Sequence, residues 1–320
     1  MAIQINGIRR QRVLLDSGQH RRPRKHNNKT SHEKYSAGFR SMERNASLLN
    51  QTARLLAKPD RIDCETAFRC IVKGCIHTMQ RCRTAAADGD ADAVHKMRIE
   101  LTRFRAVLLF FSPILTKAGW RRTRRYARWL NSRLGQARDQ DVLLQYARRR
   151  RYRRWARTSF RPIERERTKS YRKLAVDLHS ARYHRLMHDI DRQTHQPQVS
   201  SEGPQSGDVG MFSEARLLEW RDEIERTGRH LQQLGRTRQH RLRLKCKRYR
   251  YVVDSLLKLG VGLSLQDLEF RETAKQAHAT LGDLRDLRRF KCAGDGRPPR
   301  YRAKKRKLLE RAESAFRRHG

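Results

Sequence analysis

Two stretches of the chain place a histidine and several arginines at matching intervals. In "VHKMRIELTRFR", residues 94–105, arginines follow the histidine at the third, eighth and tenth positions, and "QHRLRLKCKRYR", residues 239–250, repeats this spacing. Arginine pairs with phosphate oxygens through two parallel hydrogen bonds and keeps its charge, and a nearby anion favours histidine protonation. Both stretches therefore suit anion binding. The first row is His95, Arg98, Arg103 and Arg105, and the second row is His240, Arg243, Lys247, Arg248 and Arg250.

Helical geometry gathers most of each row on one side. At about 100° per residue, the histidine and the arginines at the third and tenth positions fall within about 80° of arc, beside an apolar stripe. A row of ten residues spans about 15 Å at 1.5 Å per residue, which suits an extended ligand. Arg103 and Arg248 project elsewhere, either onto another wall of the same groove or into water. Solvated surface charge is the ordinary alternative, but two matched rows favour a shared site.

The overall charge points to a polyanionic partner. The chain has 320 residues, with 75 Lys and Arg against 33 Asp and Glu, for a net charge of +42. Such an excess repels itself in a compact state unless an anion offsets it. Nucleic acid, polyphosphate and an acidic membrane surface are the candidates.

The elements that position these rows are predicted to be helices throughout, because no stretch shows sustained apolar alternation. We expect a helix from Asp60 or Asp63 to about residue 87, and a row helix over 91–111 that Pro113 stops. Another helix should end at Gly135, with Asp139 and Asp141 starting the next. Further helices are expected near 162–178, 181–191, 213–234, 237–259, 264–281 and 300–318.

The chain also repeats on a larger scale. The rows are 145 residues apart, and "LGQARD" at 134–139 corresponds to "LGDLRD" at 281–286 with an offset of 147. This predicts an all-α fold of duplicated four-helix bundles, related by pseudo-two-fold symmetry around a basic groove or cavity. We expect Arg138 with Asp139, and Arg285 with Asp286, to hold turns together.

Composition shifts suggest the domain boundaries. Residues 1–58 are basic and aperiodic, which predicts a disordered arm. The segment 193–212 is rich in Pro, Gly, Ser and Gln and predicts a linker between a first bundle half at 59–192 and a second at 213–320.

Several function classes are disfavoured. No apolar run reaches membrane-spanning or signal-peptide length, so we expect a cytoplasmic protein without membrane insertion. The six cysteines form no C-x-x-C pair and most follow a helical apolar stripe, as buried core residues do. No clustered carboxylates, nucleophile arrangement or Gly-rich loop suggests catalysis, so we predict no metal, no cofactor and no enzyme activity.

The motifs resemble those of a known family. The pattern V-H-x-M-R-x-x-x-x-R-x-R, followed by W-L-x-x-x-L-G-x-x-R-D-x-D-V-L over residues 129–143, looks like the CHAD domain, the conserved histidine α-helical domain. The second half supplies H-x-x-R-x-x-x-K-R-x-R-Y and L-G-x-x-x-D, so the resemblance covers about residues 60–318. It implies two four-helix bundles around a basic cavity that binds inorganic polyphosphate, sometimes at polyphosphate granules. It also implies that both rows contact the ligand.

Two positions depart from the family pattern. Thr102 stands where a basic residue is common, and Glu100 places an acid near the first row. We therefore expect the first row to bind less tightly than the second.

Two other functions remain open. A nucleic-acid-binding protein would use the same charge, with nucleic acid at least a non-specific competitor, but no aromatic residue lies among the basic positions of either arc to stack on bases. An enzyme that hydrolyses or transfers polyphosphate would need a metal-binding carboxylate cluster, which the sequence does not display.

Overall fold

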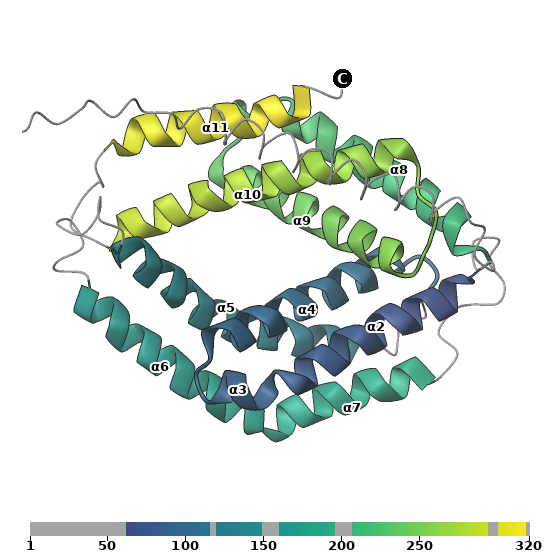
Figure 1. Ribbon diagram of the computed structural model, residues 1–320, viewed down its shortest axis with the longest axis horizontal. Helices are drawn as coiled ribbons and strands as arrows, with labels where there is room; N and C mark the ends of the chain where they lie inside the picture. The colour runs from purple at the N-terminus through teal and green to yellow at the C-terminus, as the bar shows by residue number, and fades with distance from the viewer. Residues whose placement is uncertain (1–61, 116–119, 149–159, 196–206, 294–299, 318–320) are drawn as a thin grey trace, which may run out of the picture. The chain divides into compact units, whose positions relative to one another are not determined.

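A computed structural model describes residues 62–115, 120–148, 160–195, 207–293 and 300–317, all within one unit, Ala53–Gly320. This part contains ten α-helices and no strand, which confirms the all-α prediction (Figure 1). The predicted N-terminal arm, 1–58, lies outside the described residues. The helices are α2 (Cys64–Arg81), α3 (Arg83–Ala87), α4 (Ala91–Phe110), α5 (Trp120–Arg148), α6 (Phe160–His179), α7 (Ala181–His195), α8 (Val209–Gly228), α9 (Arg236–Lys258), α10 (Leu265–Ala293) and α11 (Tyr301–Arg317), with a 3-10 turn at Leu231–Gln233.

Aspartate caps fix the starts of three helices. The Asp63 carboxylate accepts a hydrogen bond from the Thr66 backbone N–H at 2.7 Å, which confirms the predicted start of the first helix. Asp90 caps α4 in the same way, through the N–H groups of residues 92 and 93. Asp208 caps α8 by accepting from Met211 N–H at 3.1 Å, so this helix begins inside the segment predicted as a linker. A capping carboxylate satisfies N–H groups that have no partner within the helix.

Two predicted helix ends are wrong. Gly135 and Gly282 do not terminate helices, because α5 and α10 run through them without interruption. A mid-helix glycine costs about 1 kcal/mol relative to alanine, which tertiary packing can offset. The Arg243 guanidinium packs over Gly282, where an added Cβ would lie at an ordinary contact distance of 3.5 Å from Nη2. Asp139 and Asp141 therefore lie within α5, and there is no turn there for either to cap.

Smaller differences follow from local packing. The first predicted helix divides at Cys82 into α2 and α3. Helix α8 ends at Gly228 rather than near residue 234, and a Cβ at this glycine would lie 2.5 Å from the Phe316 ring of α11. Helix α7 extends to His195, past the predicted start of the linker. Of these differences, the end of α8 coincides with a close contact to a neighbouring helix.

One apolar core joins helices from both predicted halves. Helix α4 packs on α2, α5 and α9, while α9 also packs on α8 and α10, and α5 reaches α10 (Figure 1). Phe104 of α4 and Tyr249 of α9 are fully buried in the same cluster. The apolar stripe predicted beside each row is thus buried, and it fixes the direction in which each row points. No helix in the described part of the chain is long and apolar enough to cross a membrane.

Candidate anion-binding site

The two rows lie on helices that pack against each other. The first row is on α4 and the second is on α9. At their contact, the Lys247 ammonium donates to the Thr102 hydroxyl at a Nζ–Oγ1 distance of 3.4 Å. These two residues occupy matching positions, since they are separated by the 145 residues that separate the rows. The departure from the family pattern at Thr102 therefore lies at the contact between the rows.

A cavity of about 770 Å³ opens beside this contact, and we call it the α4/α9 cavity. Its walls come from α4, α5, α9 and α10. Cationic groups dominate the lining, and Asp139 is the single carboxylate among the described residues that form it. No Phe, Tyr or Trp is among these lining residues. The cationic lining residues are Arg98, Arg105, Arg124, Arg128, Arg243, Lys247, Arg248, Arg285 and Arg289, with His240 beside them.

Six of the nine predicted site residues line this cavity. They are Arg98, Arg105, His240, Arg243, Lys247 and Arg248. The other three, His95, Arg103 and Arg250, are not part of its lining. The structure thus brings four members of the second row but only two of the first to the cavity.

His95 lies close to the cavity without lining it. Its pKa is lowered by burial and by the positive charges of Arg138, Arg98 and Lys247. Its Nδ1 atom is buried and has no hydrogen-bond partner within the described structure. An unpaired buried donor or acceptor is costly, so this nitrogen can gain from a ligand or water that reaches it.

Arg103 lies outside the cavity lining and contacts other side chains of the protein. It forms an ion pair with Glu100, and both side chains are largely buried, at 16% and 13% exposed. Its guanidinium also lies 5.8 Å from the centre of the Tyr251 ring. Burial works to lower the pKa of Arg103, but Glu100 outweighs it and the pKa is raised overall. The acid near the first row, Glu100, therefore holds the Arg103 guanidinium in an ion pair within the protein.

Arg250 has protein partners as well. Its guanidinium lies 4.8 Å from the centre of the Tyr251 ring and its Nε atom 3.8 Å from an Asp254 carboxylate oxygen. These are a cation–π contact and a long ion pair, and the Nε atom has no hydrogen-bond partner in the described structure. Arg103 and Arg250 thus meet the same tyrosine from two helices.

The cations that do line the cavity repel each other strongly. Burial lowers the pKa of Lys247 from 10.5 to about 6, with Arg98 and Arg243 adding to the effect. Burial and Arg285 lower the pKa of Arg243 to about 10. Desolvation and nearby like charges both disfavour the charged form, and a bound anion would reverse the second effect. The Nε atoms of Arg98 and Arg243 are buried without a hydrogen-bond partner in the described structure, so both retain a donor for a ligand.

Four further arginines of this cavity were not predicted. Arg124 and Arg128 come from α5, and Arg285 and Arg289 from α10. Each pair is spaced by four residues, which places both members on one face of a helix. This spacing is visible in the sequence, but basic residues are so frequent in both segments that it does not stand out.

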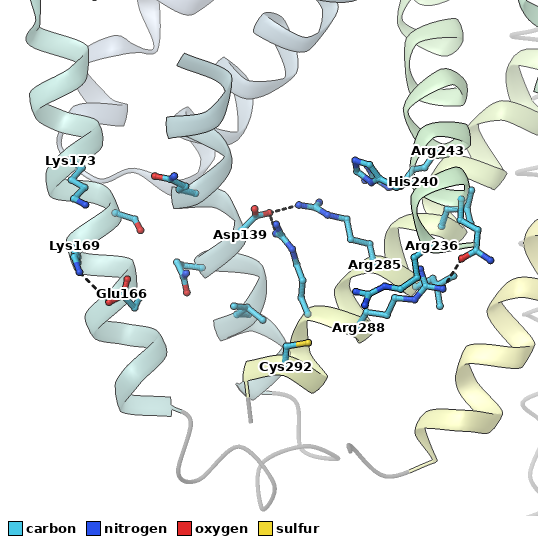
Figure 2. A pocket seen from close by; sticks show the side chains of 18 residues that line it. Asp139, Glu166, Lys169, Lys173, Arg236, His240, Arg243, Arg285, Arg288 and Cys292 are labelled. Atoms are coloured by element: carbon cyan, nitrogen blue, oxygen red, sulfur yellow. Dashed lines mark hydrogen bonds and ion pairs between the residues drawn. The ribbon is translucent and has the colours of Figure 1, made fainter. Parts of the chain in front are cut away.

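A second cavity of about 710 Å³, the α6/α10 cavity, adjoins the first. Figure 2 shows Lys169 and Lys173 of α6 on one side and Arg236, His240 and Arg288 on the other. The two cavities have six lining residues in common, and we call this set the junction: Gln136, Asp139, His240, Arg243, Arg285 and Arg289. Because they share these residues, the two cavities adjoin at the junction, and we call them together the basic path.

Asp139 connects helices from the two predicted halves. One of its carboxylate oxygens accepts from Arg285 Nη2 at 2.9 Å and also pairs with Arg289 (Figure 2). The prediction that Asp139 and Arg285 each hold a local turn is wrong, because both lie within continuous helices and pair with each other across 146 residues.

The cysteines lie outside this path, apart from Cys292 at the edge of the α6/α10 cavity. Cys64, Cys75 and Cys246 are buried in the core, as predicted for that stripe, and burial raises the pKa of each thiol. All six are free. In the described residues, no group of three or more His, Cys, Asp or Glu side chains could hold a metal ion.

Comparisons with known proteins agree with this architecture. The CHAD domain model matches residues 70–291. The crystal structure of the CHAD domain from the plant Ricinus communis superposes with a TM-score of 0.62 at 22% identity, covering 82% of this chain and 93% of that one. PptA from Streptomyces chartreusis gives a TM-score of 0.59 at 14% identity, covering 81% of this chain and 99% of that one. No curated protein sequence matches significantly. The family match spans well over half of the chain and contains both basic rows, and the protein therefore belongs to the CHAD domain family.

Proposed function

We propose that the protein binds inorganic polyphosphate, with the chain lying in the α4/α9 cavity between the two rows. The observation that carries this proposal is the charge of the lining, in which eight arginines and one lysine face a single carboxylate among the described residues. Keeping so many cations together in a partly buried site costs free energy unless an anion compensates. A linear anion with a charge on every unit matches the basic path of two adjoining cavities.

The lining of the site favours polyphosphate over nucleic acid. Single-stranded nucleic acids are usually held by stacking on aromatic side chains, and the described lining of both cavities contains no Phe, Tyr or Trp. Nucleic acid remains a competitor that the positively charged surface attracts non-specifically.

The contact between Thr102 and Lys247 supports the proposed duplication. When two repeats are related by a two-fold axis, matching residues that touch must lie near that axis. The 3.4 Å contact between these matching positions is what such symmetry predicts. In this proposal, duplicated bundles present their rows to one ligand across the axis.

We also propose a binding role without catalysis, in the cytoplasm and in association with polyphosphate granules. Divalent metals that assist phosphoryl transfer are usually held by carboxylates. The α4/α9 cavity offers only Asp139 among its described lining residues, and that carboxylate is paired with Arg285 and Arg289.

A competition titration tests the proposal. Labelled duplex DNA is bound to the protein, and long-chain polyphosphate or unlabelled DNA is added at equal phosphate concentration and fixed salt. We expect polyphosphate to displace the label at far lower concentration, and its affinity to fall steeply with salt. If unlabelled DNA competes as well as polyphosphate or better, the proposed ligand is wrong.

A further inference from the structure

The junction between the two cavities contains an anion of the protein's own. An extended ligand that occupies both cavities must pass Asp139, Arg243, Arg285 and Arg289, since all four line both spaces. The Asp139 carboxylate is bonded to Arg285 and Arg289, so it occupies the donors that a phosphate would use there. Figure 2 shows this carboxylate reaching from α5 toward α10 across the path.

A neighbouring aspartate shows that this arrangement is not a general structural feature of α5. Asp141 is 5% exposed and is bonded to Arg167 and Tyr171 of α6, at 2.8 Å in each case, away from both cavities. Asp139 is 20% exposed, and its partners Arg285 and Arg289 are 23% and 39% exposed. The Asp139 pairs are therefore accessible to a ligand, and exchanging them requires no movement of the core.

We propose that Asp139 is a specificity-determining residue that sets how strongly the site favours long polyphosphate chains over short ones. This inference rests on the proposed function. A short chain fits within one cavity and leaves the Asp139 pairs intact. A long chain lies across the junction, so its phosphates must replace the carboxylate on Arg285 and Arg289, and that exchange reduces the net gain from binding.

The same carboxylate stabilises the free protein. Asp139 offsets the mutual repulsion of Arg243, Arg285 and Arg289 while no ligand is present. Removing its charge should make the free protein less stable and leave both arginines available. The loss of stability should then be recovered when a long chain binds, because phosphates take the place of the carboxylate.

The test compares Asp139→Asn with Glu310→Gln, titrated with tripolyphosphate and with long-chain polyphosphate. Glu310 is a matched control, because it is an exposed carboxylate of α11 that pairs with Arg306 at 3.7 Å and lines neither cavity. We expect Asp139→Asn to raise the ratio of long-chain to short-chain affinity by roughly fivefold, the size of a charge-assisted hydrogen bond partly regained. Glu310→Gln should leave the ratio unchanged.

Two outcomes would overturn the inference. If Asp139→Asn weakens long-chain binding, the carboxylate positions the arginines for the ligand instead of competing with it. If both affinities rise equally, Asp139 contributes only general repulsion. If the native protein binds neither ligand, the proposed function and this inference are both wrong. If the native protein binds but Asp139→Asn leaves the affinity ratio unchanged, only the inference is wrong.

A charge-neutral variant keeps the test decisive if Asp139→Asn does not fold. The double substitution Asp139→Asn with Arg289→Gln removes the ion pair without changing the net charge. We expect both affinities to fall because a cation is lost, while the ratio of long-chain to short-chain affinity still rises. A ratio equal to or below that of the native protein would contradict the inference.

Discussion

The two basic rows have the same spacing but different surroundings. On α9, the histidine, Arg243, Lys247 and Arg248 all face the α4/α9 cavity, whereas on α4 only Arg98 and Arg105 do. For Arg103 and Arg248 the difference arises from neighbouring side chains, because Glu100 pairs with Arg103 and no equivalent acid lies next to Arg248 in the sequence. Equal spacing in the sequence therefore does not ensure that both rows reach the cavity equally. We call the row residues that line the cavity from α4 and from α9 its two walls, and the predictions below test whether the two walls contribute unequally to binding.

Removing each wall should have the largest effect. We expect Arg243→Ala, Lys247→Met and Arg248→Ala together to weaken polyphosphate binding on the order of 100-fold, since each contact is worth about 1 kcal/mol net, or about fivefold. The α4 wall, Arg98→Ala with Arg105→Ala, should cost on the order of 30-fold by the same reasoning. Calorimetric titration measures both.

Exposed cations on α11 supply the control for bulk charge. Arg302, Lys307 and Arg311 are exposed and line neither cavity, so replacing all three by Ala removes the same charge as the α9 variant. We expect a change of about twofold from the altered long-range field. An equal loss in the α11 and α9 variants would mean that the protein binds through net charge alone.

Two single substitutions at equivalent positions of the rows test the effect of Glu100. Arg248→Ala should weaken binding by about fivefold, because Arg248 lines the cavity. Arg103→Ala, at the equivalent position of the first row, should leave the affinity unchanged but lower the melting temperature, since it leaves Glu100 largely buried without its partner. Equal losses of affinity from the two substitutions would show that the walls are used alike.

The affinity should depend on pH through Lys247. Its pKa in the free protein is about 6, because it is buried and faces Arg98, Arg243, Arg250 and Arg285. A bound polyanion raises this pKa, so binding takes up a proton and the affinity falls as pH rises above about 6. Titrations in buffers of different ionisation enthalpy measure the uptake, and Lys247→Met should reduce it. If Lys247→Met takes up as many protons on binding as the native protein, groups other than Lys247 are responsible for the uptake.

The stability of the free protein should change in the opposite direction. The pKa of Lys247 falls from 10.5 to about 6 on folding, so the unfolded chain binds more protons between these values. The contribution of Lys247 is therefore most favourable above pH 10.5 and is lost progressively as the pH falls toward 6. Urea unfolding of the native protein and of Lys247→Met across this window should show a smaller pH dependence in the variant.

The smallest expected effect concerns the contact between the rows. Thr102→Lys would place a second ammonium beside Lys247, whose Nζ atom lies 3.4 Å from the threonine hydroxyl. We expect the free protein to lose about 1 kcal/mol of stability from like-charge repulsion. Polyphosphate affinity should rise by about twofold, with a salt dependence steeper by roughly one unit. Thr102→Val is the control, and the same affinity in both variants would show that this position does not reach the ligand.

The sequence predicted the class of fold and the row helices well, because both depend on local periodicity. The two helices that carry the rows, α4 and α9, begin and end within one residue of their predicted bounds. The burial of their apolar stripes followed from the same periodicity. These features require no knowledge of which helix packs against which.

Features that depend on distant partners were not predicted. Gly135 was predicted to end a helix because glycine favours C-caps, and another helix was predicted to end near residue 281, yet α5 and α10 continue past both positions through their packing on neighbouring helices. The partners of Asp139 lie 146 and 150 residues away, so its position next to Arg138 suggested a local role. Arg103 and Arg248 each stand eight residues after the histidine of their row, so the sequence does not distinguish them. The structure does, because Arg103 contacts Glu100 and Tyr251 whereas Arg248 lines the cavity.

The most direct test of the central claim is the structure of the protein bound to long-chain polyphosphate. We predict phosphates in the α4/α9 cavity, within hydrogen-bond distance of Arg98 on one wall and Arg243 on the other, with more contacts to α9 than to α4. Phosphates bound only to exposed cations such as those of α11, with the cavity free of phosphate, would contradict it.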